Sequence, residues 1–592
     1  MSCPKSPAKS NRLLDDFSTT DDLSDTLSSA LHPSKCLHLQ QSLSFLMCLK
    51  LFRRLTKSSL GNTSFYSLHH LSYLNRDLST FFNKVGYVSH HFFDIAVLVV
   101  KEFVQSNTFH VTPKSFPLLQ SFASFFGAEV QSVSLEVTGT FNVDMFLSYA
   151  TIITGLEIDL EKSSDLDFLN TSSSIFPRLK EFQVHPVYSI SLTSEFIELL
   201  KVNNTVTCIN LDQNSIGDDG ASALADVLKV NTSVTNIFLD DNSFTCRGAN
   251  ALADALKVNN ILTMIDLMNN SIGDEGARAF ADMLKVNTTL SYICLSYNNS
   301  IGDEGAACLA DALKVNTTVT KIDLSGNSID VKGAKALADM FSENATLASI
   351  DLQNNSIGDY GASALAEALE VNTTITSIEL DENLIGDFGA GALAEALVVN
   401  TTVTRIGLMQ NSIGDFGASA LAEALFDNTT ITEIGLTQNF IGDFGASALA
   451  EALVVNTTVT RIGLWNNSIG DKGARALADA MKVNTTIDAI DLSGNSIGNE
   501  GAVALAEAMK VNSTVNYIGL GRNSIGNEGA VALAEAMKVN STVNYIGLSG
   551  NSIGDDGITA LTDVLKVKPN IKICVRRGSI LTALGTASPP RT

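Results

Sequence analysis

The chain has 592 residues, of which 45% are hydrophobic, and a formal net charge of −24. A chain of this length exceeds one ordinary globular core, so several domains or a repeat array are expected. Residues 1–110 carry about three net positive charges and residues 566–592 about six, so the acidic charge lies between them. This acidic centre would repel phosphate, which excludes nucleic acid as its expected partner.

The N-terminal residues carry no signal for export or membrane insertion. Residues 1–22 contain lysines without an apolar stretch behind them, so no secretory signal is expected. Apolar runs such as residues 92–100 are too short to cross a bilayer. The eight cysteines form no CxxC pair and no metal-ligand spacing. We therefore expect a cytoplasmic protein, with the nucleus as the alternative, and no transmembrane segment, cofactor or metal.

Weaker segments precede the clear repeats. Residues 1–30 are rich in Ser, Thr and Asp and are expected to be a disordered tail. Residues 31–125 are predicted to form a small helical N-terminal region or cap. Strand-like stretches begin near residues 130, 153 and 179, at a spacing of about 25 residues. Residues 126–205 are therefore predicted to be degenerate repeats at the start of an array.

Residues 206–565 contain thirteen copies of a unit of 28 residues, of which one is a residue longer near Asn298–Asn299. In each copy an alternating stretch such as Val403-x-x-Ile406-x-Leu408 predicts a short, half-buried strand. The Ala- and Leu-rich stretch that follows has helical spacing. Strands stack about 4.8 Å apart and helices about 8–10 Å apart, so the layers must bend with the strands inside. Residues 566–592 are predicted to be a C-terminal cap and basic tail.

Polar residues at fixed positions predict local structure. Asp387, Asp415 and Asp443 precede helical stretches and are expected to cap their own helices. The asparagine that ends each helix is expected to adopt the left-handed conformation. The asparagine of each strand-to-helix loop, such as Asn411 and Asn439, is expected to form a buried ladder.

The pattern LxxNxIGDxGAxALAEAL, seen for example at residues 408–425, resembles the ribonuclease-inhibitor-like class of leucine-rich repeats. That class includes the repeat arrays of NOD-like receptors and the Ran GTPase-activating proteins. The resemblance implies an α/β leucine-rich-repeat solenoid, a horseshoe with a parallel inner β-sheet and outer α-helices. It also implies protein partners at the concave face or the rims, and it does not identify them.

Two motifs suggest chemistry, but the repeat explains them better. The stretch Gly494–Gly498 matches the G-x-S-x-G nucleophile motif, yet every histidine lies at or before His185. The recurrent Asn-Thr-Thr, as at Asn400, is a glycosylation sequon that here is expected to be a helix-ending turn. We therefore predict a non-enzymatic signalling scaffold without catalytic residues.

Two other functions stay open. One is GTPase activation of the Ran-activator type on a small GTPase, although the acidic tail common in that family is replaced by a basic one. The other is a sensor or regulator of the NOD-like-receptor type that lacks its nucleotide-binding module, since no GxxxxGK[ST] motif is present.

The predicted inner face carries a first set of candidate binding residues. Its acids predict a protein partner with a basic surface. Further along, Gly407, Gly435 and Gly463 would form a shallow floor that a ligand backbone could approach. Arginine and the single tryptophan flank this floor as interface anchors. The candidate residues on this face are Asp351, Glu379, Asp381, Glu382, Arg405, Arg461 and Trp465.

A second set lies at the turn before each helix, where most repeats carry a charged residue before the glycine of GDxG. In four consecutive repeats this residue is aromatic, namely Tyr360, Phe388, Phe416 and Phe444. Such a row predicts an exposed apolar patch, which monomers rarely keep without use. The alternative is tandem duplication of one phenylalanine, because residues 386–408 and 442–464 differ only at Gly391 and Ser447.

Overall fold

The computed structural model describes residues 65–67, 108–111, 132–137, 155–160, 181–186, 194–298, 300–576, 579–582 and 585–587. Strands β1 (Phe65–Ser67) and β2 (Thr108–Val111) pair in parallel. The tail predicted over residues 1–30 and the rest of the helical region predicted over 31–125 lie outside the described residues. The interpretation of residues 126–205 as degenerate repeats likewise stays a prediction, because most of that segment is not described.

From β3 to β19 every strand pairs in parallel with the next strand along the chain. Strands β20 (Ser579–Thr582) and β21 (Gly585–Ala587) then add in antiparallel fashion, within the residues where a C-terminal cap and basic tail are expected from the sequence. The parallel strands are β3 Ser132–Val137, β4 Gly155–Leu160, β5 Glu181–Pro186, β6 Cys208–Asn210, β7 Asn236–Phe238, β8 Met264–Asp266, β9 Tyr292–Cys294, β10 Lys321–Asp323, β11 Ser349–Asp351, β12 Ser377–Glu379, β13 Arg405–Gly407, β14 Glu433–Gly435, β15 Arg461–Gly463, β16 Ala489–Asp491, β17 Tyr517–Gly519, β18 Tyr545–Gly547 and β19 Lys572–Arg576.

One helix separates each strand from the next between β5 and β19. Among the described residues no helix combines the length and apolar character needed to span a bilayer. The helices are α7 Ser194–Val202, α8 Gly217–Leu228, α9 Cys246–Leu256, α10 Gly273–Leu284, α11 Asp303–Leu313, α12 Val331–Phe341, α13 Gly358–Leu369, α14 Asp387–Val399, α15 Asp415–Asp427, α16 Asp443–Val455, α17 Asp471–Met481, α18 Asn499–Val511, α19 Asn527–Val539 and α20 Asp555–Val567.

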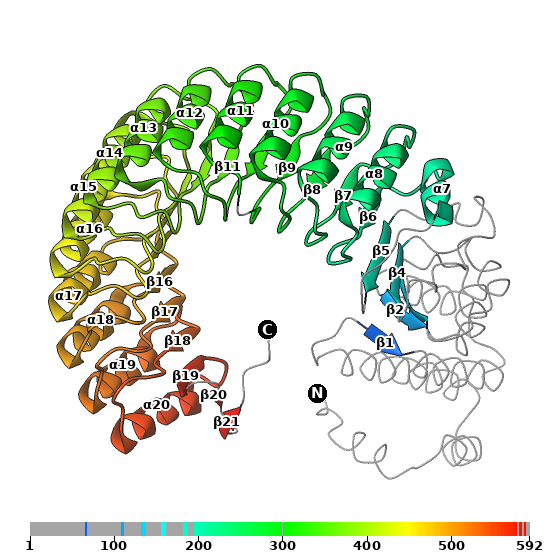
Figure 1. The fold of residues 1–592 in the computed structure, drawn as a ribbon. Helices are drawn as coiled ribbons and strands as arrows, with labels where there is room; N and C mark the ends of the chain where they lie inside the picture. The colour runs from blue at the N-terminus through cyan, green and yellow to red at the C-terminus, as the bar shows by residue number, and fades with distance from the viewer. Residues whose placement is uncertain are drawn as a thin grey trace, which may run out of the picture. The chain divides into compact units, whose positions relative to one another are not determined.

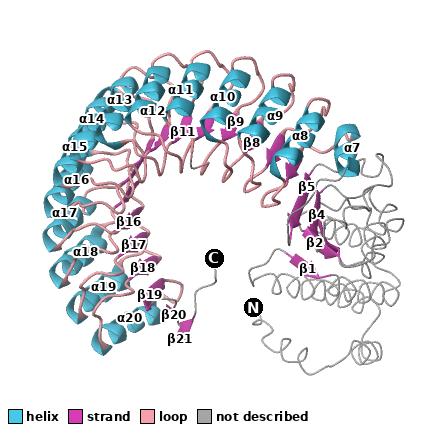
Figure 2. Ribbon diagram, viewed as in Figure 1, coloured by secondary structure: helices cyan, strands magenta, loops and turns pink. Residues whose placement is uncertain are grey.

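The array from β6 to α20 is an arc with the strands on its inner side and the helices on its outer side (Figures 1 and 2). This arrangement confirms the predicted α/β solenoid with units of 28 residues. The physical cause is the difference in spacing between strands and helices, which one flat layer could not accommodate.

The core lies between the sheet and the helices and repeats in every unit. Ile406 and Leu408 of the strand segment and Ile413 of the loop are fully buried, and the helix residues Leu421 and Leu425 are buried against them. Because each unit buries its apolar face against its neighbours, stability comes from stacking.

The predicted asparagine ladder of the loops is confirmed. The Nδ2 group of Asn411 donates to the carbonyl oxygens of Leu380 and Met409 at 2.9 and 3.2 Å. Its Oδ1 atom accepts the backbone N–H groups of Asn383 and Ile385 at 3.0 and 2.9 Å. One buried amide thus joins two adjacent repeats and satisfies backbone groups that would otherwise be unpaired.

The asparagines at the helix ends form a second ladder. Asn400 Nδ2 donates to the carbonyl oxygens of Leu369 and Asn372, and its Oδ1 accepts from the N–H groups of Thr402 and Val403. The expected left-handed conformation is wrong, because Asn400 is extended, with φ −73° and ψ 128°. The Asn400 side chain, rather than a backbone with positive φ, provides hydrogen-bond partners for the backbone groups of the turn. The Nδ2 of this sequon is therefore buried and engaged, which supports the turn interpretation over glycosylation.

The expected capping of α14, α15 and α16 by their own aspartates Asp387, Asp415 and Asp443 is also wrong. Helix α15 begins at Asp415, and Gly414 holds the N-cap position. The Asp415 Oδ1 atom instead accepts the N–H groups of Gly442 and Gly445 in the next repeat, at 2.8 Å each. The carboxylate therefore caps the neighbouring helix, whose first N–H groups have no partner within their own helix.

This cap explains why glycine follows the residue that varies between repeats, as Gly445 follows Phe444. A Cβ atom at Gly445 would lie 2.9 Å from the Cβ of Ala418 and 3.0 Å from the Oδ1 of Asp415. Both distances are too short for an unstrained side chain. The close approach of consecutive helices therefore requires glycine at this position.

The chain provides an internal control for this cap, because Asn499 accepts the N–H groups of Gly526 and Gly529 in the same way. We predict that Asp415→Ala lowers the free energy of unfolding by about 1–2 kcal/mol, because two amides lose their acceptor. Asp415→Asn should stay within about 0.5 kcal/mol of wild type, because the amide oxygen can replace the carboxylate oxygen. Urea unfolding with hydrogen exchange at Gly442 and Gly445 measures both effects, and equal losses in the two variants would contradict the cap.

Candidate functional site

Four carboxylates lie close together on the inner face and are here called the concave acidic strip: Asp323, Asp351, Glu379 and Asp381. The first three face one another at equal register on β10, β11 and β12. Burial, followed by repulsion from Asp323, raises the pKa of Asp351 to about 6. Burial is also the largest cause that raises the pKa of Asp381 to about 6. Like charges on adjacent strands are thus held together at neutral pH against their mutual repulsion.

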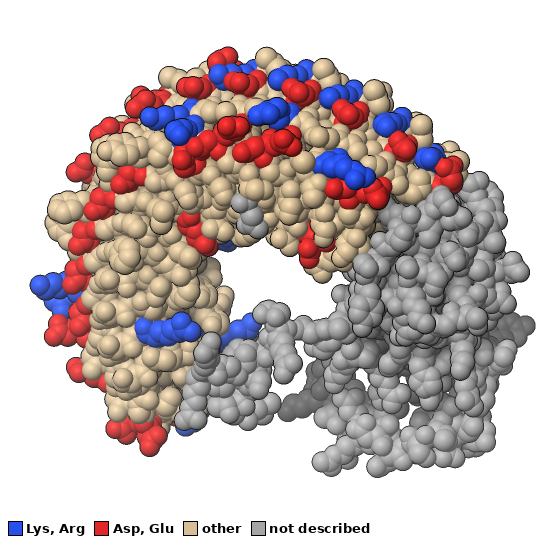
Figure 3. Space-filling model, in the orientation of Figure 1, with Lys and Arg blue, Asp and Glu red and all other residues tan. Residues whose placement is uncertain are grey.

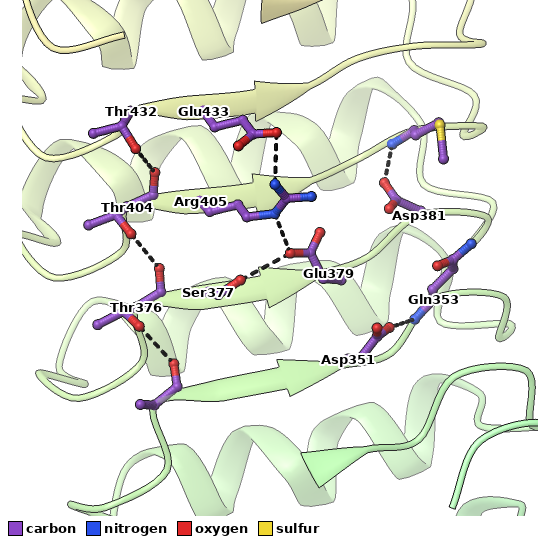
Figure 4. Close-up of polar contacts among 12 residues, drawn as sticks. Asp351, Gln353, Thr376, Ser377, Glu379, Asp381, Thr404, Arg405, Thr432 and Glu433 are labelled. Atoms are coloured by element: carbon purple, nitrogen blue, oxygen red, sulfur yellow. Dashed lines mark hydrogen bonds and ion pairs between the residues drawn. The ribbon is translucent and has the colours of Figure 1, made fainter. Parts of the chain in front are cut away.

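Arg405 is held between two acids from neighbouring strands. Its Nε atom lies 2.6 Å from Glu379 Oε1 on β12, and its Nη1 atom lies 2.7 Å from Glu433 Oε1 on β14 (Figure 4). Glu379 Oε1 also accepts from the Ser377 hydroxyl. The other oxygen, Oε2, is buried and has no hydrogen-bond partner among the described residues. Arg405 therefore neutralises one end of the concave acidic strip, and its guanidinium is already engaged within the chain.

The loop acids next to the strip are fixed by local contacts. Asp381 Oδ1 accepts the backbone N–H of Met409 in the next repeat (Figure 4). Asp351 Oδ1 accepts the N–H of Gln353, whose side chain reaches Glu382 Oε1 at 3.5 Å. The structure thus brings Asp351, Glu379, Asp381, Glu382 and Arg405 together in three consecutive repeats.

The predicted glycine floor is only partly open. At Gly407 a Cβ atom would lie only 2.9 and 3.0 Å from the Asp381 carboxylate oxygens and would also clash with Glu379. The missing side chain therefore makes room for two acids of the concave acidic strip, and not for a ligand backbone. At Gly435 the nearest atoms lie 3.8 Å away, so that position is open. Gly463 faces the Thr437 hydroxyl.

Arg461 and Trp465 lie further along the inner face, outside the cluster around Arg405. Arg461 is exposed on β15, and its Nε atom lies 3.9 Å from Asp488 Oδ1. Trp465 follows the same strand and is partly exposed. The structure therefore leaves both side chains accessible without joining them to the acidic cluster.

The four predicted aromatic residues lie within the first turn of helices α13–α16, rather than in the turns before them, along one rim of the array. Their exposed fractions are 70% for Tyr360, 60% for Phe388, 78% for Phe416 and 63% for Phe444. The rings of Tyr360 and Phe388 lie 5.9 Å apart, centroid to centroid, with a tilt of 58°. The row is thus exposed, and burial in the core does not explain these side chains.

Two further apolar residues on the same rim were missed by the sequence analysis. Leu384 and Phe440 are 70% and 66% exposed, at a position where the other eleven repeats have serine. Leu384 also has a φ of 60°, a conformation that costs a residue with a Cβ atom about 1–2 kcal/mol. The serine pattern was the signal that could have found them. We name the six residues the rim patch: Tyr360, Leu384, Phe388, Phe416, Phe440 and Phe444.

The rim patch coincides with the most acidic part of the array. Residues 336–460 contain seventeen Asp and Glu but a single cation, Arg405. Over α8–α12 basic and acidic side chains alternate on the surface, whereas over α13–α16 only acidic ones are seen (Figure 3). Apolar anchors and uncompensated negative charge therefore occur in the same repeats.

A stacked pair of tyrosines on the inner face was also missed. The rings of Tyr517 and Tyr545 lie 4.9 Å apart and nearly parallel, on the adjacent strands β17 and β18. The Tyr517 hydroxyl donates to Asp491 Oδ2 at 3.3 Å. Residues 495–520 and 523–548 are identical, so copying of one unit explains this pair.

The raised pKa of Asp381 makes stability depend on pH. The folded chain binds this proton more tightly than the unfolded chain, whose aspartate pKa stays near its usual 3.8, so this contribution to stability increases as pH falls through about 6. We predict that Asp381→Asn, which keeps the acceptor for Met409, raises the free energy of unfolding by about 1–2 kcal/mol at pH 7.5 and hardly at all at pH 4. Denaturant unfolding at both pH values tests this. A gain of equal size at both would show that charge is not the cause.

Comparison with known proteins supports the same architecture. A family model described as leucine-rich repeat matches ten segments: residues 202–225, 258–281, 286–310, 315–338, 343–366, 399–422, 455–478, 483–506, 511–534 and 539–561. No curated protein matches the chain. Among solved structures, actin-binding site 2 of leiomodin-1 is 26% identical, with 22% of this chain and 76% of that chain covered and a TM-score of 0.21. An internalin from Listeria monocytogenes is 18% identical, with 62% and 86% covered and a TM-score of 0.40.

The ten matched segments recur through the array at the period of the strands and helices described above. The ribonuclease-inhibitor-like class within the family stays a prediction. The repeated sequence, its parallel sheet with outer helices and the matching family model together establish that this chain belongs to the leucine-rich-repeat proteins.

Proposed function

We propose that this chain is a non-enzymatic protein-interaction module of the cytoplasm or nucleus that holds a partner with a basic surface. The leucine-rich repeats support the general role of a protein-interaction module. The observation that carries the proposal is the coincidence of the rim patch with the acidic residues 336–460. Exposed apolar side chains provide anchors for the partner, and uncompensated carboxylates favour a partner whose surface is positively charged.

The concave acidic strip also favours a partner with a positively charged surface. Burial is the largest cause of the raised pKa of Asp351, and repulsion from Asp323, Glu379 and Asp381 adds to it. Lysine or arginine side chains of a partner would relieve this repulsion, and burial in the interface would strengthen each pair relative to water. An anionic partner would add to the repulsion.

Tandem duplication is the alternative explanation of the aromatic row. It accounts for identical copies, but the rim patch is not made of identical copies. Tyr360 occupies the position of Phe388, and Leu384 occupies that of Phe440. Apolar character therefore recurs with different residues, which favours use of the surface over copying alone.

Capture of partners from a lysate of the source cells tests the proposal. The rim variant Phe388→Glu/Phe416→Glu/Phe444→Glu introduces residues that other repeats carry at this position, such as Glu275 and Glu500, so it should fold. We expect it to lose about ten-fold or more of the captured partner, as loss of hot-spot anchors does. The concave variant Asp351→Asn/Glu379→Gln should weaken capture and lower its salt dependence.

The control for this experiment is Val258→Glu/Val286→Glu, which changes exposed valines beyond the ends of α9 and α10, away from the rim patch. It should capture partners as wild type does, and circular dichroism should show that all variants fold. Unchanged capture by both the rim and the concave variants would refute the proposed function. Accelerated GTP hydrolysis by a small GTPase on addition of the chain would instead favour the GTPase-activating alternative.

A further inference from the structure

The rim patch has a composition that the fold itself does not require. Other repeats fill the same two positions with serine and with residues that are mostly charged, and they form the same loops and helices. All six side chains of the rim patch are at least 60% exposed. The patch is therefore a surface that lacks a covering layer in the described part of the chain.

Charge restricts what can cover it. The surrounding residues 336–460 have a net charge of −16, from seventeen acids and one arginine that is already paired with Glu379 and Glu433. An acidic segment or an anionic lipid surface would be repelled, whereas a basic segment of a protein would be attracted.

The backbone of the rim restricts the conformation of the occupant. The N–H groups at the start of the helices are taken up by aspartates of the preceding repeat: Asp359 accepts from Gly386 and Gly389, and Asp387 accepts from Gly414 and Gly417. An extended segment would lay its own N–H and C=O groups on this surface and find few partners. A helix satisfies its backbone internally and presents only side chains.

The spacing of the rings agrees with a helical occupant. The centroids of Tyr360 and Phe388 lie 5.9 Å apart. Residues i and i+4 of an α-helix are separated by a rise of about 6 Å, so two neighbouring apolar residues on one helix face match the rings of Tyr360 and Phe388. A helix with apolar residues at i, i+4, i+7 and i+11 covers about 16 Å in three turns, and the rim patch, which lies on four helices about 8–10 Å apart, is long enough to hold it along its whole length.

We infer that the rim patch is the docking site for a basic amphipathic helix of a partner protein. Its apolar face would lie on the six side chains, and its lysines or arginines would face the surrounding carboxylates. This inference rests on the proposed function and specifies the partner's recognition element.

The probe is a synthetic peptide of about 16 residues, with leucines at i, i+4, i+7 and i+11 and lysines at most other positions. The control peptide has the same composition, with its leucines spread around the helix. Fluorescence anisotropy with the full-length chain at physiological salt should show the amphipathic peptide binding about ten-fold or more tightly than the control, because only it offers an apolar face.

Two matched variants locate the site without changing charge. Leu384→Ser/Phe440→Ser restores the serine of the other repeats and should weaken binding of the amphipathic peptide about ten-fold. Val399→Ser/Val455→Ser removes valines that are 56% and 55% exposed at the opposite ends of α14 and α16. This control lies in the same two repeats and should bind as wild type does.

Three outcomes would overturn the inference: no binding of the amphipathic peptide, equal binding of both peptides, or unchanged affinity of Leu384→Ser/Phe440→Ser. Equal binding would mean that charge alone attracts the peptide. Each of these results leaves the capture experiment untouched. If the rim variant still loses its cellular partner, the proposed function stands and only the helical occupant is wrong.

Discussion

Asn411 donates to two carbonyl groups and accepts from two N–H groups, and the backbone groups it joins belong to two adjacent repeats. The asparagine at most helix ends makes an equivalent exchange, and the aspartate or asparagine at most helix starts accepts N–H groups of the next repeat. Every repeat therefore needs its neighbour to satisfy its own buried backbone. Because an unpaired buried amide costs about 1–3 kcal/mol, these three side chains hold adjacent repeats in one register, and the asparagine bonds persist across the unit with the extra residue.

This exchange explains which positions are invariant within the array and which vary. The loop asparagine, the glycine after the variable residue and the buried leucines are held by contacts between repeats. The residue before that glycine and the residue after the loop asparagine point outward, so the scaffold tolerates serine, glutamate or phenylalanine there. Differences between repeats are therefore concentrated where a partner could contact them. This separation of scaffold from surface makes a run of exposed phenylalanines informative.

The fold could be predicted because its causes are periodic. Alternating residues such as Ile406 and Leu408 indicate a strand, and the difference between strand and helix spacing then requires a curved array. The loop asparagine ladder follows from the same logic. The capping role of Asp415 could not be predicted, because its acceptor geometry depends on the distance between repeats, and local sequence favours the nearer helix.

The candidate site likewise has features that could be predicted from the sequence and features that could not. Exposure of the aromatic row followed from its position in the unit, and the structure agrees. The glycine floor is open at Gly435 but filled at Gly407 by the Asp381 and Glu379 carboxylates, because a missing side chain does not say what fills the space. Leu384 and Phe440 were missed although the serines of the other repeats point to them. Comparing every outward position across all repeats, rather than selected ones, would have found both.

The concave acidic strip and the rim patch both lower the stability of the free chain. Carboxylates stacked on adjacent strands and a leucine at positive φ both disfavour the isolated chain, and neither fills the core. A continuous array can tolerate such local costs, because its stability is distributed over many interfaces between repeats. A partner that brings cations and apolar groups would remove the repulsion and cover the exposed rings in one step. The features that weaken the free chain in these repeats are therefore those that would strengthen a complex.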